Sequence, residues 1–219
     1  MKQILSALLL LTLTATAFAQ SDKYISAMTP KVAALDTTRD GAALLDLSNA
    51  FERIATTEKN QWLPYYYAAL AQVNYGMTKL DHSGMGGDPK VIDPIADKAD
   101  TLLSKAEAMS PNNSEIFVVH KLIDRTRMLV DPQNRYMSFG MKAQQDLATA
   151  EKLNPENPRV YLLQGEDKYF TPEQYGGSKD EAKKLFDTAQ QKYNSFKPEN
   201  SLAPNWGKYT LQYFLSQYK

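Results

Sequence analysis

Small and large apolar residues recur along the chain with the spacing of an α-helix. In four places a small residue is followed by a large apolar one four positions later and a second small one three positions after that: Ala43/Leu47/Ala50, Ala99/Leu103/Ala106, Ala143/Leu147/Ala150 and Ala182/Phe186/Ala189. Residues three and four apart lie on one face of a helix, so each set forms a stripe that a neighbouring helix can approach closely. The recurrence indicates a helical repeat.

Prolines, glycines and polar clusters between these stripes predict where the helices begin and end. Pro64, Pro94 and Pro158 each stand where a helix is expected to start, because a proline in the first turn loses no hydrogen bond. Three longer stretches, 81–93, 130–140 and 170–177, are read as connectors. Six predicted helices have both ends defined: 22–36, 62–76, 94–110, 114–129, 158–169 and 204–218. Of three further helices, one begins at 41, one ends at 153 and one begins at 178. No strand is predicted.

The order of these elements resembles the tetratricopeptide repeat, in which an aromatic and a small residue follow the opening of the first helix of each pair. Pro158 is followed by Tyr161 and Gly165 at the offsets of that family, and Pro64 is followed by Tyr67 and Ala71. The resemblance implies an all-α, tetratricopeptide-like solenoid of about four helix pairs plus a C-terminal capping helix. This repeat domain is expected to span residues 20–219.

Two segments of the second half carry a more specific resemblance. The stretches YGGSKDEAKKLF (175–186) and PNWG (204–207) are similar to a group of exported bacterial proteins with tetratricopeptide-like repeats. The resemblance implies a location in the envelope or outside the cell, and it implies no enzyme activity.

The N-terminus has the layout of a secretory signal peptide. Lys2 precedes an apolar run over 4–13, and Ala17, Phe18 and Ala19 form a small-residue cleavage site. Cleavage after Ala19 would leave a periplasmic or secreted protein without membrane insertion. A membrane span is the alternative, but it needs about 20 strongly apolar residues.

Charge and cysteine content exclude several classes of function. The chain has 25 basic and 25 acidic residues, so no basic field is available for nucleic acid. It has no cysteine, which excludes disulfides, a thiolate nucleophile and a cysteine-ligated zinc site. The connector 81–93 is rich in aspartate and glycine, but its spacing does not match a calcium loop. We therefore predict no catalytic residue, no metal and no cofactor.

Candidate binding residues lie mainly in the connectors. In a repeat of helix pairs the connectors within the pairs lie on one edge, so we expect the three long ones to form a binding surface. Arg135 and Tyr136 combine an arginine with an aromatic side chain, a frequent pairing at interfaces. The alternative is that Arg135 holds its own loop in place through Asp131 or a helix C-terminal carbonyl. The further partner-binding candidates are His82, Tyr175 and Tyr66.

Two functional hypotheses follow from this pattern. The first is an exported, non-enzymatic module that binds a protein or peptide partner in its groove or along the connector edge. The second is a small-ligand-binding accessory protein of an envelope uptake system, with a pocket formed by 65–67, Arg135 and Tyr175. An enclosed apolar cavity would favour the second hypothesis and an open groove the first.

Overall fold

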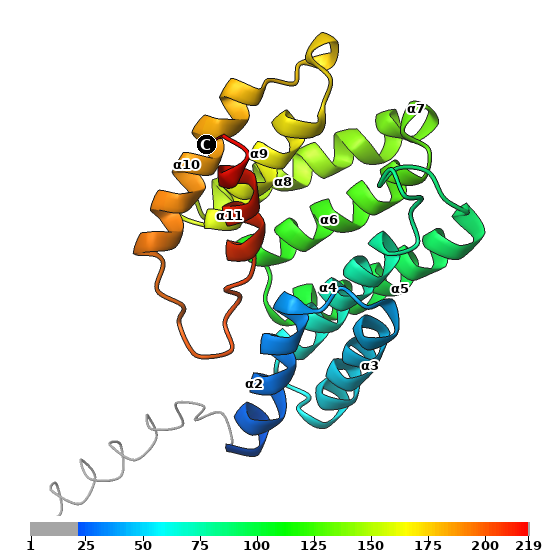
Figure 1. Cartoon of the computed structure of the whole chain (residues 1–219). Helices are drawn as coiled ribbons and strands as arrows, with labels where there is room; N and C mark the ends of the chain where they lie inside the picture. Colours follow the sequence, from blue (N-terminus) through cyan, green and yellow to red (C-terminus); the bar gives the residue numbers. More distant parts are fainter. Residues whose placement is uncertain (1–21, 219) are drawn as a thin grey trace, which may run out of the picture.

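The structure is a computed structural model that describes residues 22–218. All regular structure in this range is helical, so the predicted all-α class is confirmed (Figure 1). Helices that follow one another along the chain pack against each other, as in a helical repeat. The predicted signal peptide, residues 1–19, lies outside the described residues.

The first pair consists of α2 (Asp22–Thr37) and α3 (Gly41–Thr57). Asp40 begins α3 as its N-cap, because its carboxylate accepts a hydrogen bond from the backbone N–H of Ala43 at 2.8 Å. α2 contributes three buried side chains to the core: Tyr24, Met28 and Leu35.

The sequence interpretation of α3 was off by one position. Its buried face does not contain the set Ala43/Leu47/Ala50, but consists of Leu44, Ser48, Phe51 and Ala55. Leu44, Ser48 and Phe51 have the same spacing as the predicted set, but here the small residue lies between two large ones. Ser48 is the point of close approach, since its hydroxyl donates to the carbonyl of Ala68 in the next helix at 3.0 Å.

The second pair consists of α4 (Leu63–Met77) and α5 (Pro89–Met109). α5 begins at Pro89, earlier than the start predicted at Pro94. Asp88 accepts a hydrogen bond from the N–H of Lys90 at 2.9 Å, so Asp88 and Pro89 together form a complete helix start. Pro94 then lies inside the helix, where it removes one backbone hydrogen bond.

The third pair consists of α6 (Ser114–Val130) and α8 (Met141–Leu153). The connector predicted between them is itself helical: it comprises α7 (Pro132–Arg135) and a π-helical turn, η1 (Tyr136–Gly140), which leads directly into α8. The connector is therefore ordered by backbone hydrogen bonds of its own.

The fourth pair is α9 (Pro158–Phe170) and α10 (Lys179–Ser195), with the 3₁₀ turn η2 (Glu173–Tyr175) between them. The last helix, α11 (Lys208–Ser216), starts later than predicted and leaves Trp206 in the segment before it.

The turn into α10 contains two glycines with different roles. Gly176 has a φ of +89°, and a Cβ on Gly177 would lie 1.7 Å from the carbonyl oxygen of Thr171. Ser178 caps α10 by accepting from the N–H of Glu181 at 3.1 Å. Ser178 and Glu181 have the spacing of a capping box, but the box is incomplete because the Glu181 carboxylate pairs with the Nζ of Lys168 at 2.6 Å.

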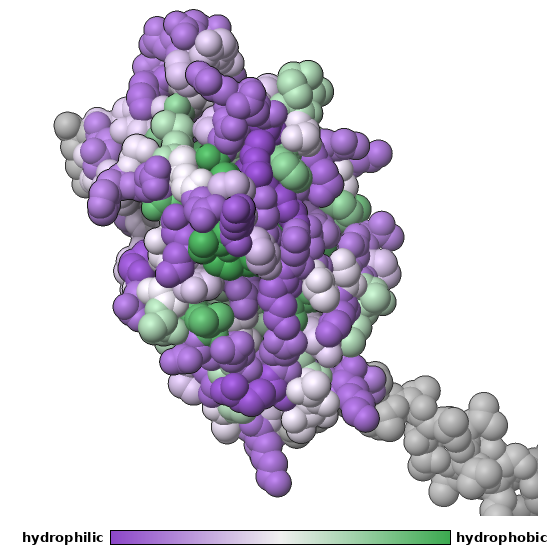
Figure 2. Space-filling view, turned by 90° about the vertical axis from the view of Figure 1, so that its right-hand side faces the viewer, coloured by the Kyte–Doolittle hydropathy of each residue, from purple (hydrophilic) through white to green (hydrophobic). Residues whose placement is uncertain are grey.

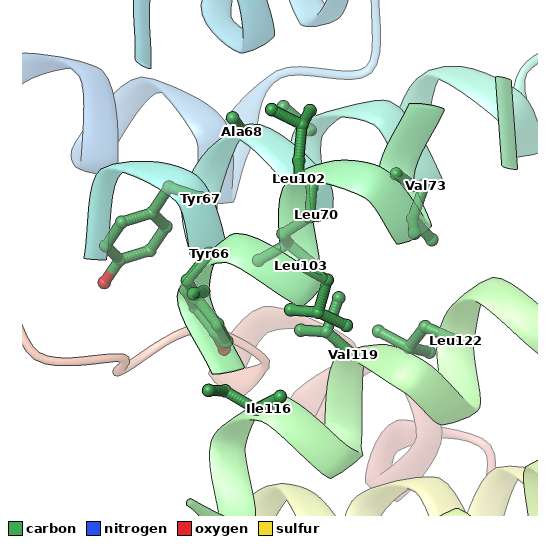
Figure 3. Close-up of a cluster of buried hydrophobic side chains, with 14 of the residues drawn as sticks. Tyr66, Tyr67, Ala68, Leu70, Val73, Leu102, Leu103, Ile116, Val119 and Leu122 are labelled. Carbon is green, nitrogen blue, oxygen red and sulfur yellow. The ribbon is translucent and has the colours of Figure 1, made fainter. Parts of the chain in front are cut away.

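The largest core lies where α4 packs against its neighbours α2, α3, α5 and α6. Figure 3 shows side chains of α4, α5 and α6 meeting there, with Leu103 and Val119 close together. A second, smaller core joins α9, α10 and α11, where the rings of Phe186 and Phe214 stack with centroids 4.8 Å apart.

The segment between α10 and α11, residues 196–207, returns to the first half of the molecule. Leu202 is fully buried in the larger core, and its carbonyl accepts a hydrogen bond from the hydroxyl of Tyr67 at 2.7 Å. The segment thereby brings α11 close to α2, although the two helices stand at opposite ends of the chain (Figure 1).

Candidate ligand-binding groove

A groove of about 820 Å³ lies between α2, α4, α6, α9, α11 and the segment 196–207. The first helix of each pair contributes to it, so the groove runs along the inner layer of the repeat. It is neither a sealed cavity nor a flat surface. The aliphatic side chains of its walls include Val32, Leu70, Val73, Leu122, Leu162 and Leu163.

Exposed aromatic rings line the groove on one side. Tyr209 and Tyr213 stand one turn apart on α11, and both are more than half exposed, at 64% and 61%. Trp206 precedes them and also lines the groove. Large apolar rings left exposed beside a groove are a common feature of binding sites.

Four charged residues line the groove: Asp36, Arg39, Arg125 and Glu166. The Nη1 of Arg125 lies 2.5 Å from the Oε2 of Glu166. Asp36 accepts a 3.5 Å hydrogen bond from the N–H of Gly207. Burial raises the pKa of Asp36, and the Gly207 N–H and Arg39 offset this only in part.

A buried polar network supports the tryptophan side of the groove. The Nε1 of Trp206 donates to the hydroxyl of Tyr66 at 2.8 Å, and that hydroxyl donates to Glu115 at 3.3 Å. Arg159 forms a two-point contact with Glu115, because the Nε and Nη2 of Arg159 donate to the two carboxylate oxygens of Glu115. The Arg159 guanidinium also lies 5.8 Å from the ring of Trp206. This network fixes Trp206 relative to α4 and α9.

Two of the predicted site residues, Arg135 and Tyr136, are neighbours outside this groove. Arg135 forms a bidentate ion pair with Asp93, with N–O distances of 2.7 and 2.9 Å, and donates to the carbonyl of Arg127 at 3.2 Å. It therefore holds the connector against α5 and α6. The acidic partner is Asp93 and not Asp131, and the carbonyl of Arg127, in the last turn of α6, is the helix C-terminal carbonyl that the alternative expected. Tyr136 is 45% exposed, and its hydroxyl accepts from Gln144 at 3.0 Å.

The structure does not bring the other three predicted residues together. His82 is exposed in the first connector, and Tyr175 is exposed in η2. Tyr66 has no exposed surface, so the sequence interpretation of Tyr66 as a contact residue needs correction: the side chain supports Trp206 from inside the core.

The sequence interpretation expected the three connectors to form one continuous edge. The first two are joined by the ion pair of Arg135 with Asp93, and the N–H of Gly86 donates to the carbonyl of Leu129, in the last turn of α6, at 2.7 Å. In Figure 1 the third connector lies beyond α7, at the top of the molecule, so an edge shared by all three stays a prediction. Figure 2 shows the face on the side of α3, α5 and α7, where hydrophilic residues dominate and hydrophobic ones form small, separate patches.

Neither histidine lines the groove. His120 on α6 is hydrogen-bonded to Glu107 at 3.3 Å and lies 3.8 Å from Asp100. Burial lowers its pKa, but these two carboxylates raise it more, so the net pKa is above the ordinary value. Within residues 22–218, no three acidic or histidine side chains are grouped so that they could hold a metal ion.

Fold and groove together define a class: an all-helical, repeat-like protein whose described residues form a large groove along the inner layer. No helix of the part that the structure describes is long and apolar enough to span a bilayer. No protein-family model matches the sequence, and no curated protein matches it either.

A solved structure is similar to this chain over nearly its full length. It is the HusA haemophore from Porphyromonas gingivalis, with 32% sequence identity, a TM-score of 0.78, and coverage of 91% of this chain and 94% of that chain. Identity at this level over almost the whole of both proteins shows that the chain belongs to the HusA family.

Proposed function

We propose that this chain is an exported, non-enzymatic carrier that binds a planar tetrapyrrole, haem or a related porphyrin, in the groove between α2 and α11. The observation that carries the proposal is the large, mostly apolar groove in a chain that is 32% identical to a haemophore. This favours the small-ligand hypothesis over a protein or peptide partner.

The dimensions and walls of the groove suit such a ligand. A volume of about 820 Å³ lies within the range usual for small-molecule sites, about 300–1,000 Å³. A porphyrin is a flat aromatic ring with an apolar perimeter and acidic side groups. Tyr209 and Tyr213 offer ring faces for stacking, and the aliphatic walls of α4, α6 and α9 exclude water from the edge of the ring.

The usual iron ligands are scarce in the groove. Haem iron in proteins is held by histidine, cysteine, methionine or tyrosine. The chain has no cysteine, and both histidines lie elsewhere. Met77, Tyr209 and Tyr213 are the remaining candidates, and the hydroxyl of Tyr67 is engaged by Leu202. We therefore expect the faces of the ring and its acidic groups to supply most of the affinity.

The proposal is tested by titrating the mature chain with haemin and with iron-free protoporphyrin IX, followed by the porphyrin absorption band. Both are expected to bind, with dissociation constants within about tenfold of each other. Replacing Tyr209 and Tyr213 together by alanine is expected to weaken binding by about tenfold or more.

Tyr175→Ala is the matched control, because Tyr175 is as exposed as the groove tyrosines but does not line the groove. Its affinity is expected to equal that of the parent chain. Absence of binding, or equal losses in the control and the double variant, would contradict the proposal.

A further inference from the structure

Arg125 has an unused hydrogen-bond donor, its Nη2, in the wall of the groove. Its Nη1 is paired with Glu166, but its Nε is buried and has no hydrogen-bond partner. No hydrogen bond within residues 22–218 uses its Nη2 either. A buried N–H without an acceptor is uncommon in proteins, because its lost hydration is not replaced.

Arg159 shows what this edge of a guanidinium does when it has a partner. Its Nε and Nη2 both donate to the carboxylate of Glu115, one to each oxygen. Such a two-point contact is the preferred geometry between arginine and a carboxylate. In Arg125 the Nε is shielded from solvent, whereas the Nη2 is unpaired and is not among the buried atoms, so Nη2 is the donor that a ligand carboxylate in the groove can reach.

Arg39 adds a second positive charge to the same groove. It follows α2 and donates from Nη1 to the carbonyls of Asp36 and Thr38, at 3.2 and 2.8 Å. Among the described residues, no carboxylate lies within ion-pair distance of Arg39. Its charge is therefore available to an anionic group at the groove.

We propose that Arg125, assisted by Arg39, binds the carboxylate side groups of the ligand, so that the groove selects tetrapyrroles with free carboxylates over those without. This inference rests on the proposed function. It names the chemical feature by which the groove distinguishes one porphyrin from another.

The experiment compares protoporphyrin IX with its dimethyl ester, which has the same ring and no free carboxylate. The parent chain is expected to bind the acid about tenfold or more tightly than the ester. Arg125→Lys keeps a positive charge beside Glu166 but removes the Nη2 donor, so the preference for the acid is expected to shrink, with a larger loss of affinity for the acid than for the ester. Arg39→Gln is expected to reduce the preference in the same direction.

Arg53→Lys is the control, because Arg53 is exposed on α3 away from the groove. Equal affinities of the parent chain for acid and ester would overturn this inference and leave the proposed function intact. An acid preference that survives both groove variants would overturn the assignment to these arginines. If neither compound binds, the proposed function fails, and this inference fails with it. Should Arg125→Lys not fold, the parent comparison and Arg39→Gln still decide.

Discussion

Glu115→Gln tests the buried network that holds Trp206 at the groove. Glu115 accepts hydrogen bonds from Arg159, Asn157 and Tyr66, and the Arg159 side chain has no exposed surface. Glutamine has nearly the same shape as glutamate but no charge. The substitution therefore leaves a buried guanidinium without its counter-charge and places an amide N–H₂ group near it.

The expected loss is large because both members of the pair are shielded from water. Removing one partner of a buried ion pair costs about 3–5 kcal/mol of the free energy of unfolding. For a chain of this length, each kcal/mol lowers the melting temperature by about 2–4 °C, so we expect a fall of roughly 6–20 °C. Urea unfolding followed by circular dichroism would give the free energy directly.

Glu156→Gln is the matched control for this prediction. Glu156 pairs with Lys192, but 70% of its side chain is exposed, so the same substitution is expected to cost less than about 1 kcal/mol. A loss below about 1 kcal/mol for Glu115→Gln would refute the reasoning, since the network would then contribute no more than a surface pair.

Two further predictions concern a helix cap and a buried carboxyl group. Ser178→Ala removes the acceptor for the N–H of Glu181 and is expected to cost about 1 kcal/mol; an unchanged thermal melt would show that the cap is not needed. Burial, partly offset by Lys142 and His120, raises the pKa of Asp146 to about 6. The stability that this protonated group contributes is present below about pH 4 and is lost as the pH rises through about 6. Asp146→Asn imitates the protonated form, so the stability difference between variant and parent should grow over this range, and a constant difference would contradict the assignment.

The helical periodicity predicted the fold well because most stripes of small and large residues coincide with buried faces. Ala99/Leu103/Ala106, Ala143/Leu147/Ala150 and Ala182/Phe186/Ala189 are all buried. The stripe in α3 was misplaced because two periodic sets lie side by side there, one position apart. The set that contains Phe51 is the buried one, because the ring of Phe51 stacks on Tyr67 with centroids 5.4 Å apart.

The groove could not be located from the sequence, because its residues come from both ends of the chain. Nothing in the local pattern shows that 196–207 folds back onto α4, which is what brings Tyr209 close to α2. One signal was present: the last helix has more aromatic residues than a single buried stripe needs. Leu211 and Phe214 fill the core, and the surplus Tyr209 and Tyr213 remain exposed.

The connectors contain most of the candidate binding residues because they combine arginine, histidine and aromatic side chains. The structure uses Arg135 to tie the second connector to Asp93, an acidic residue 42 positions earlier in the chain. Sequence spacing could indicate that Arg135 has a carboxylate partner, but it could not identify one so distant. The functional importance of Arg135, Tyr136, Tyr175 and His82 stays a prediction.

Hydrogen exchange of backbone amides, measured by mass spectrometry with and without protoporphyrin IX, tests most directly whether the ligand occupies the groove. We predict slower exchange in residues 29–39 and 201–214, which both line the groove, and unchanged exchange in the connector residues 81–88 and 130–140. Protection confined to those connectors, or no protection at saturating porphyrin, would contradict it.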